Sequence, residues 1–242
     1  MRVWGITDVG AVRSQNQDAY YHTAFDEPYP FALVCDGMGG AKAGNVASVM
    51  AVDSIKDTLR PALSGPITPE IEPLLLQAVE RANELICYRS EMDPDCQGMG
   101  TTLVGAVIEP EVVRLVNVGD SRAYLITGEG IRQITRDHSV VEDMVERGEI
   151  TQEQARSHPR KNLITRALGA ESTVQADLYT LERVEGQFLL LCSDGLSNVV
   201  TDQELLFELL HGGPPEDACQ RLLNLALSRG APDNVTAVLI QL

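Results

Sequence analysis

Aspartates at the ends of apolar runs are the residues of this chain best suited to metal chemistry. Asp36 ends the run FALVCD, Asp120 follows LVNVG, and Asp194 follows FLLLC after one serine. Aspartate is a poor strand residue, and a charge at the end of a buried strand is costly unless something compensates it. One such residue is commonly a turn-former. Three of them favour a shared site.

Two further aspartates could join that site: Asp18 in SQNQDAY and Asp233 in RGAPDNV, just before a final apolar run. If the strand ends converge, they form an oxygen-rich pocket without a His or Cys cluster, which suits Mg²⁺ or Mn²⁺ rather than zinc or copper. Two such ions about 3.5–4 Å apart can activate a water for in-line displacement. Glycines at 37, 39 and 40 lack a Cβ, so backbone carbonyls there could approach an ion.

Arg13 is a candidate of another kind. It lies five residues before Asp18, in GAVRSQNQD. A guanidinium presents a planar fork that matches phosphate oxygens, which the lysine ammonium does not. A single arginine is weak support by itself, and it gains weight from the aspartates around it.

Strands and helices must position these residues. Short β-rich runs, TTLVGAVIE, VVRLVNV, RAYLIT and IRQIT, are separated by turn residues and predict an antiparallel meander. Elsewhere, strands are predicted over 2–7, 31–35, FLLLC and VTAVLIQL, and helices over 43–59, 73–88, near 202–211 and over 215–229. The stretch 138–168 is polar and carries two weak helical pieces, VVEDMVERG and TQEQARS. Together these elements predict a layered α+β sandwich.

Bulk properties narrow the class of protein. The chain has 242 residues and no linker or low-complexity stretch, so we predict one domain over 1–242. A net charge of −16 argues against non-specific binding to nucleic acid or to an anionic membrane. Five cysteines form neither a disulfide framework nor a zinc site. No secretory signal or membrane span is visible, so we expect a cytoplasmic protein without membrane insertion.

In this order and spacing, the motifs resemble those of the metal-dependent serine/threonine protein phosphatases of type 2C, in particular their bacterial single-domain branch. The resemblance covers nearly the whole chain. It rests on TDVGAVRSQNQD, DGMGG, GMGTTL, VGDSRAY, TRDHS, HPRKNLITRALG, LLLCSDGL and DNVT.

The resemblance implies a four-layer α-β-β-α sandwich of two antiparallel sheets flanked by helix pairs, with a dinuclear Mn²⁺ or Mg²⁺ centre at one end. Asp36 would bridge the metals, Gly37 would offer its carbonyl, and Asp194 and Asp233 would hold one metal. Asp18 would act mainly through metal-bound water, and Arg13 would bind the substrate phosphate. Asp120 would join Asp194 at a third, weaker metal site. Residues of about 139–168 would form a flap beside the active site.

The implied reaction is direct attack of a metal-bridging hydroxide on phosphoserine or phosphothreonine in proteins, without a phosphoenzyme. This reaction would oppose a cognate eukaryotic-type Ser/Thr kinase. We expect the protein to be a monomer. No Cys occupies a C-x₅-R arrangement, so Cys35 and Cys192 are interpreted as buried strand residues, with redox sensitivity as a minor hypothesis. His138 and His158 are interpreted as structural.

Ala41 departs from the family pattern, because many bacterial members have histidine after DGMGG. A histidine there could protonate the leaving alkoxide, so reduced rather than absent activity is predicted. Three alternatives remain open: an inactive relative that binds phosphoproteins, a hydrolase of small phosphoesters, and an acidic cation-binding protein without catalysis. All the expected carboxylates are present, which disfavours the first, and no EF-hand spacing supports the last.

Overall fold

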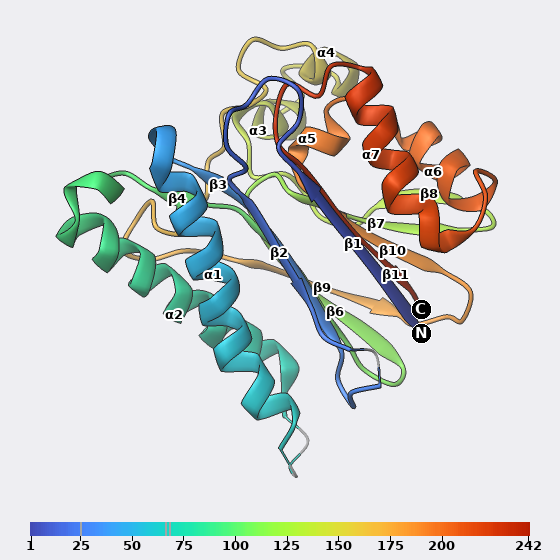
Figure 1. Ribbon diagram of the computed structural model, residues 1–242, viewed down its shortest axis with the longest axis horizontal. Helices are drawn as coiled ribbons and strands as arrows, with labels where there is room; N and C mark the ends of the chain where they lie inside the picture. Colours follow the sequence, from blue (N-terminus) through green and yellow to red (C-terminus); the bar gives the residue numbers. More distant parts are fainter. Residues whose placement is uncertain (25, 66, 68) are drawn as a thin grey trace.

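Two antiparallel sheets stack face to face in the computed structural model (Figure 1), which describes residues 1–24, 26–65, 67 and 69–242, without the side chains of 40–42. One sheet has the order β1 (Arg2–Asp8), β11 (Val235–Gln241), β10 (Phe188–Cys192), β7 (Arg122–Thr127), β8 (Gly130–Gln133). The other has the order β2 (Asp18–His22), β3 (Phe31–Met38), β5 (Leu103–Ile108), β6 (Val112–Val118), β9 (Asp177–Glu182), with the short β4 (Gly100–Thr101) paired to the end of β3.

Helices cover the outer face of each sheet, which completes the four predicted layers. The long helices α1 (Gly40–Leu63) and α2 (Ile71–Met92) pack on the sheet that contains β3. The shorter α6 (Asp202–Leu210) and α7 (Ala218–Ser228) pack on the sheet that contains β11. Buried apolar clusters fill all three interfaces between layers, so the predicted α+β sandwich is confirmed.

The sequence alternation along β3 decides which side chains enter the space between the sheets. Phe31, Leu33 and Cys35 pack toward the helices, whereas Ala32 and Val34 pack against the other sheet. Because successive strand residues point to opposite faces, the next residue of the second set is Asp36. In β10 the same alternation sends Leu189 and Leu191 between the sheets.

Helix α1 approaches the end of β3 closely because its inner face carries small side chains. Ala43, Ala47 and Ala51 repeat at intervals of four and are buried, followed by Ile55 and Leu59. Val49 of the same helix is 50% exposed and lies off this face. The helix therefore packs through an alanine stripe.

The predicted meander is wrong at residues 119–121. Strands β5 and β6 pair in one sheet, whereas β7 and β8 pair in the other, so the chain changes sheets between β6 and β7. Two strands, β2 and β9, were not predicted. Both pair along one side only and have mostly half-buried side chains, which weakens the apolar pattern that a sequence reveals.

The segment between β8 and β9 carries two short helices, α3 (Val140–Glu146) and α4 (Gln152–Arg156), close to the two predicted helical pieces. An isolated bridge joins Ser139 to Ile164 and closes the segment at its base, and a second bridge joins Leu168 to Thr101 of β4, beside the end of β3. A last short helix, α5 (Asp194–Ser197), follows β10. Within the described ranges, no helix combines the length and the apolar character needed to span a bilayer.

Candidate active site

Asp18 and Asp36 are direct cross-strand partners. Strands β2 and β3 pair in the register Asp18 to Asp36, and both residues lie on the face that is turned toward the other sheet. Two hydroxyls from the other sheet, those of Ser193 and Thr236, each donate to Asp18 Oδ2 over 2.7 Å. The Asp18 side chain therefore joins the two sheets at their common end.

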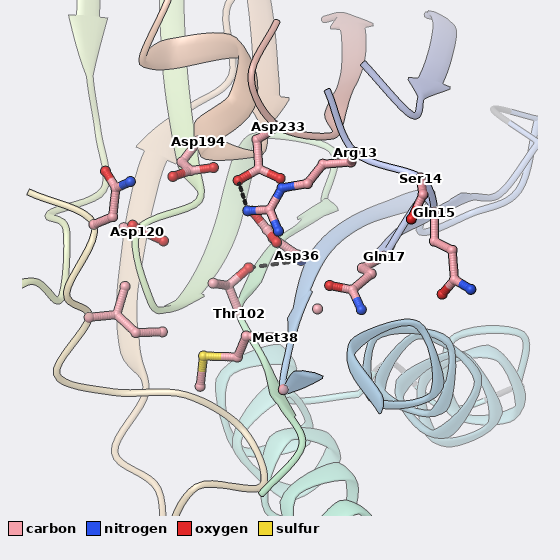
Figure 2. A pocket seen from close by; sticks show the side chains of 14 residues that line it. Arg13, Ser14, Gln15, Gln17, Asp36, Met38, Thr102, Asp120, Asp194 and Asp233 are labelled. Carbon is pink, nitrogen blue, oxygen red and sulfur yellow. Dashed lines mark hydrogen bonds and ion pairs between the residues drawn. The ribbon is translucent and has the colours of Figure 1, made fainter. Parts of the chain in front are cut away.

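Two threonines at the end of β4 and directly after it hold the backbone of Asp36. The Asp36 N–H donates to Thr102 Oγ1 over 2.9 Å, and the Asp36 carbonyl accepts from the Thr102 N–H and the Thr101 hydroxyl. Figure 2 shows Thr102 directly beside Asp36. These contacts give the motif GMGTTL a physical role that the sequence analysis did not assign: it fixes where the Asp36 carboxylate points.

Asp194 and Asp233 come from the other sheet. Asp194 begins α5, after β10, and accepts from Asn198 Nδ2 over 2.9 Å. Asp233 precedes β11, and its Oδ1 accepts from the Asn234 N–H. The loops that carry them are in close contact, because a Cβ at Gly195 would collide with the Asn234 carbonyl oxygen. The two carboxylates thus belong to one rigid corner of the sandwich.

These carboxylates line one pocket of about 490 Å³ at the end of the sandwich (Figure 2). Of the predicted site residues, the pocket brings together Arg13, Asp36, Gly37, Asp120, Asp194 and Asp233. Asp18 is not among the lining residues; it is 8% exposed and lies behind Asp36.

Burial and mutual repulsion raise the pKa of four acids here: Asp36, Asp120 and Asp194 in the pocket, and Asp18 behind it. The Asp36 pKa lies well above its usual range, first because burial removes the carboxyl from water and then because Asp18 and Asp194 are near. The pKa values of Asp120 and Asp194 are raised for the same first reason. For Asp18, burial raises the pKa to about 6, against the lowering effect of the hydrogen bonds from Thr236 and Ser193.

The donor set fits a hard divalent cation. Every acid in the pocket offers oxygen, Asp18 Oδ1 is buried without a hydrogen-bond partner among the described residues, and Arg13 is the one arginine or lysine along the described lining. No three His, Cys, Asp or Glu side chains of the described chain converge into a ready-made metal cage. Hard ions of the Mg²⁺ type commonly bind through one or two carboxylates and water, so an open arrangement is compatible with such an ion.

Arg13 reaches the pocket from the loop between β1 and β2. Its Nη2 donates to Asp233 Oδ2 over 2.8 Å, and its side chain is 52% exposed. The guanidinium therefore lies at the mouth of the pocket (Figure 2), where an incoming anion would meet it before the carboxylates.

Asn234 holds the loop that carries Arg13, a role that the sequence analysis missed. The side chain is 4% exposed. Its Nδ2 donates to the carbonyls of Val9 and Gln15, and its Oδ1 accepts from the Gln17 N–H, each at 2.8–2.9 Å. The motif DNVT contained the signal, since a buried amide beside a charged residue must find hydrogen-bond partners.

Gly37 and Gly39 serve the turn and the packing around Asp36. A Cβ at Gly37 would collide with the Gly44 carbonyl oxygen of α1, and one at Gly44 would lie 2.7 Å from the Gly37 carbonyl oxygen. Gly39 has φ +120°, a left-handed value that favours glycine. Close strand–helix contact thus requires glycine at 37 independently of any metal, and the carbonyl role of Gly37 stays a prediction.

A second set of charged residues adjoins Asp120. Arg122 donates to both Asp137 oxygens at 2.7–3.1 Å. His138 is buried; its Nδ1 accepts from the Gly119 N–H and its Nε2 faces Asp177 Oδ2 over 3.1 Å. Burial lowers the pKa of His138. His138 does not line the pocket, which agrees with a structural role, and His158 caps the nearby Arg160 N–H.

Cys35 and Cys192 are fully buried strand residues. Burial raises the pKa of Cys192 to about 12 and that of Cys35 further above its ordinary value. A thiol that stays protonated is a poor nucleophile, so the interpretation of both as packing residues agrees with the structure.

Comparison with known proteins gives consistent results. The family model described as protein phosphatase 2C matches residues 11–225. A serine/threonine phosphatase, stp, of Listeria monocytogenes is 39% identical over 235 residues, which cover 97% of this chain and 93% of the relative.

Solved structures extend the likeness to three dimensions. The serine/threonine phosphatase Stp1 from Staphylococcus aureus superposes with a TM-score of 0.91 at 36% identity, over 99% of this chain and 94% of that one. The catalytic domain of the serine/threonine protein phosphatase PstP, solved with two manganese ions, superposes with a TM-score of 0.85 at 36% identity, over 98% and 96% of the two chains.

Proposed function

We propose that this chain, which belongs to the protein phosphatase 2C family and is a serine/threonine protein phosphatase of that type, hydrolyses phosphoserine and phosphothreonine in proteins by direct attack of an activated water. The observation that carries the mechanism is the crowding of Asp36, Asp194 and Asp233 around one open pocket with Arg13 at its mouth. Neighbouring carboxylates of this kind suit divalent cations, which supply an activated water, so no nucleophilic side chain is needed.

Asp36, with the Gly37 carbonyl, and Asp194 with Asp233 are the groups proposed to hold two Mn²⁺ or Mg²⁺ ions. Asp120 lies in the same pocket and is proposed to join Asp194 at a third, weaker site. Such ions, when bound, would lower the pKa of a bound water and neutralise phosphate charge. Binding of two manganese ions by the PstP catalytic domain supports the choice of metal.

The side chains of the protein have separate tasks around this centre. Arg13 binds the non-bridging phosphate oxygens with its planar fork and exchanges its contact with Asp233 for the substrate. Asp18 stays behind Asp36, where its unpartnered Oδ1 is available to accept from an ordered water. Thr102 and Asn234 keep the Asp36 carboxylate and the Arg13 loop in place.

The segment of about 139–168 is proposed to act as a flap that controls access and product release, within a single catalytic domain over 1–242. Asn162 and Ile164 of this segment line the pocket. The Ser139–Ile164 bridge closes the segment at its base, and its middle carries only two short helices, which supports a role as a movable cover.

The biological setting is proposed on the same basis. A phosphatase of this type removes phosphate that a eukaryotic-type Ser/Thr kinase has added, and we propose such a kinase as the opposing enzyme in the cytoplasm. We propose that the protein acts as a monomer.

Hydrolysis of a phosphothreonine peptide tests the proposal. Phosphate release is measured with millimolar Mn²⁺, after EDTA, and in Asp194→Asn. Activity that needs Mn²⁺ and is lost in the variant is expected. A folded wild-type protein that binds the phosphopeptide without hydrolysing it would instead identify an inactive phosphoprotein-binding relative, and rapid hydrolysis of small phosphoesters alone would identify a metabolite hydrolase.

A further inference from the structure

A second cavity of about 480 Å³ opens beside the candidate active site and shares part of its wall. Met38 and Ile164 line both cavities, so the two cavities adjoin each other. Met38 ends β3, two residues after Asp36 (Figure 2), and Ile164 lies in the proposed flap. We name the cavity between Met38 and residues 164–175 the flanking groove.

The flanking groove has an apolar wall. Besides Met38 and Ile164, its lining includes Ala167, Ala170 and Val174. The Met38 side chain lies over Gly100, where a Cβ would be 3.0 Å from Met38 Cε and 3.8 Å from Ala167 Cβ. A thioether adapts to side chains of different shapes, so this wall can accept an apolar residue.

Among the described residues, the charge along the flanking groove that no ion pair neutralises is negative. Arg166 is neutralised, because its Nη1 donates to Asp177 Oδ1 over 2.8 Å. Glu171 is exposed and makes no ion pair with the described part of the chain. With a net charge of −16 on the whole chain, a cationic neighbour is favoured there.

We propose that the flanking groove binds the residues beside the phosphorylated serine or threonine of a protein substrate and selects an apolar side chain next to a lysine or arginine. This inference rests on the proposed phosphoprotein phosphatase function. A small phosphoester fills only the pocket around Asp36 and leaves the groove empty, whereas a polypeptide continues past Met38 into it. The apolar side chain packs on Met38 and Val174, and the cation pairs with Glu171.

Two peptides and two variants test the flanking groove. One peptide carries leucine and lysine beside phosphothreonine, the other alanine and glutamate, and p-nitrophenyl phosphate is the small substrate. The variants are Val174→Asp and the surface change Glu171→Lys. Matched controls are Val184→Asp and Glu185→Lys, whose original side chains are exposed outside both cavities.

The wild-type protein is expected to prefer the leucine–lysine peptide by about tenfold in kcat/KM, the scale of discrimination that one apolar contact provides. Val174→Asp should remove most of this preference through KM while hydrolysis of p-nitrophenyl phosphate stays within about twofold. Glu171→Lys should reduce or reverse the preference for the cationic peptide. The control variants should behave like the wild type.

Three results would overturn the inference. Equal kcat/KM values for the two peptides would show that the flanking groove does not select between them. An unchanged preference in Glu171→Lys would show that the Glu171 charge plays no part, and this result does not depend on whether Val174→Asp folds. A parallel loss of p-nitrophenyl phosphate hydrolysis in both variants would assign these residues to support of the catalytic centre. Failure of the wild type on both peptides, with p-nitrophenyl phosphate hydrolysed, would contradict the proposed function itself.

Discussion

The Thr236 hydroxyl donates to Asp18 Oδ2 over 2.7 Å and so joins the inner faces of the two sheets. Thr7 lies 2.7 Å from Thr236 and must donate to it, because the single Thr236 hydrogen is already used. Asn16 Nδ2 donates to Thr7 in turn. A directed chain of hydrogen bonds therefore runs from the Arg13 loop to the acid behind Asp36.

Asp18 should make stability depend on pH. Its pKa is raised from 3.8 to about 6, so between these values the native carboxyl keeps a proton that the unfolded chain has lost. Its contribution to the free energy of unfolding therefore decreases as pH rises through this window. In the metal-free protein, Asp18→Asn is expected to stabilise by about 1–3 kcal/mol at pH 7.5 and by much less at pH 4.

Urea unfolding in EDTA across pH 4–7.5 measures this difference. Equal effects of Asp18→Asn at both ends of the range would contradict the assignment of the raised pKa to Asp18. The exposed change Asp57→Asn serves as the control.

Metal ions should stabilise the protein by relieving the crowded acids. Free Mn²⁺ at a hundred times its Kd is expected to add about 2.7 kcal/mol to the free energy of unfolding. The thermal midpoint should rise with Mn²⁺ in the wild type and in Asp57→Asn, and much less in Asp194→Asn, which loses a proposed ligand. A midpoint shift of equal size in all three proteins would place the stabilising ions elsewhere.

Asn234→Ala should weaken phosphate binding through the Arg13 loop. The change removes the hydrogen bonds that Asn234 makes with the Val9 and Gln15 carbonyls and the Gln17 N–H, so a loss of about 1–3 kcal/mol of stability is also expected. The KM for p-nitrophenyl phosphate should rise. Asn224→Ala, at an exposed helical position, is the matched control.

A double-mutant cycle separates this effect from general loosening. If Asn234 acts by positioning Arg13, Asn234→Ala should change KM little once Arg13→Ala is present. Additive effects of the two changes on KM would show that Asn234 acts on the site by another route.

Gly37→Ala should destabilise the protein with or without metal. The new methyl group would collide with the Gly44 carbonyl oxygen, and overpacking of this kind costs about 1–3 kcal/mol or more. Gly128→Ala, where nothing lies within 4 Å of the added atom, should change stability little. Chemical denaturation in EDTA measures both variants. A stable Gly37→Ala protein would show that α1 can move away from β3.

Ala41→His tests whether a histidine after DGMGG can protonate the leaving alkoxide and raise activity. The side chain at 41 is outside the described residues, so this prediction rests on the sequence alone. A histidine there is expected to raise turnover, by up to about 100-fold if proton transfer to the leaving group is limiting. Ala41→Gln is the control of similar size without a titratable ring. Unchanged turnover in Ala41→His would show that no side chain is needed at 41 for that proton.

Asp36 was predictable because it continues a two-residue alternation. In FALVCD, every second residue faces the other sheet, and Asp36 takes the last such position. The polar partners Thr102, Ser193 and Thr236 were less visible, since a hydroxyl does not reveal from its own sequence whether it faces solvent or a carboxylate. Their locations inside conspicuous motifs were the available signal.

The fold was predictable where local pattern and burial agree. The long helices and the strands buried on both faces were predicted, whereas β2 and β9, with half-buried side chains, were not. The change of sheets at Gly119 was also missed, because a tight hairpin and a crossing between stacked sheets can use the same turn residues. Long-range pairing decides between them.

Stacking of the two sheets has a kinetic consequence. Strand β1 pairs with β11 in the register Arg2 to Gln241, and the acids come from both sheets, so the pocket is among the last parts of the molecule to be completed. Contacts of such high sequence separation form late in folding. Ions bound there should therefore prolong the lifetime of the native state by slowing unfolding while leaving the folding rate nearly unchanged.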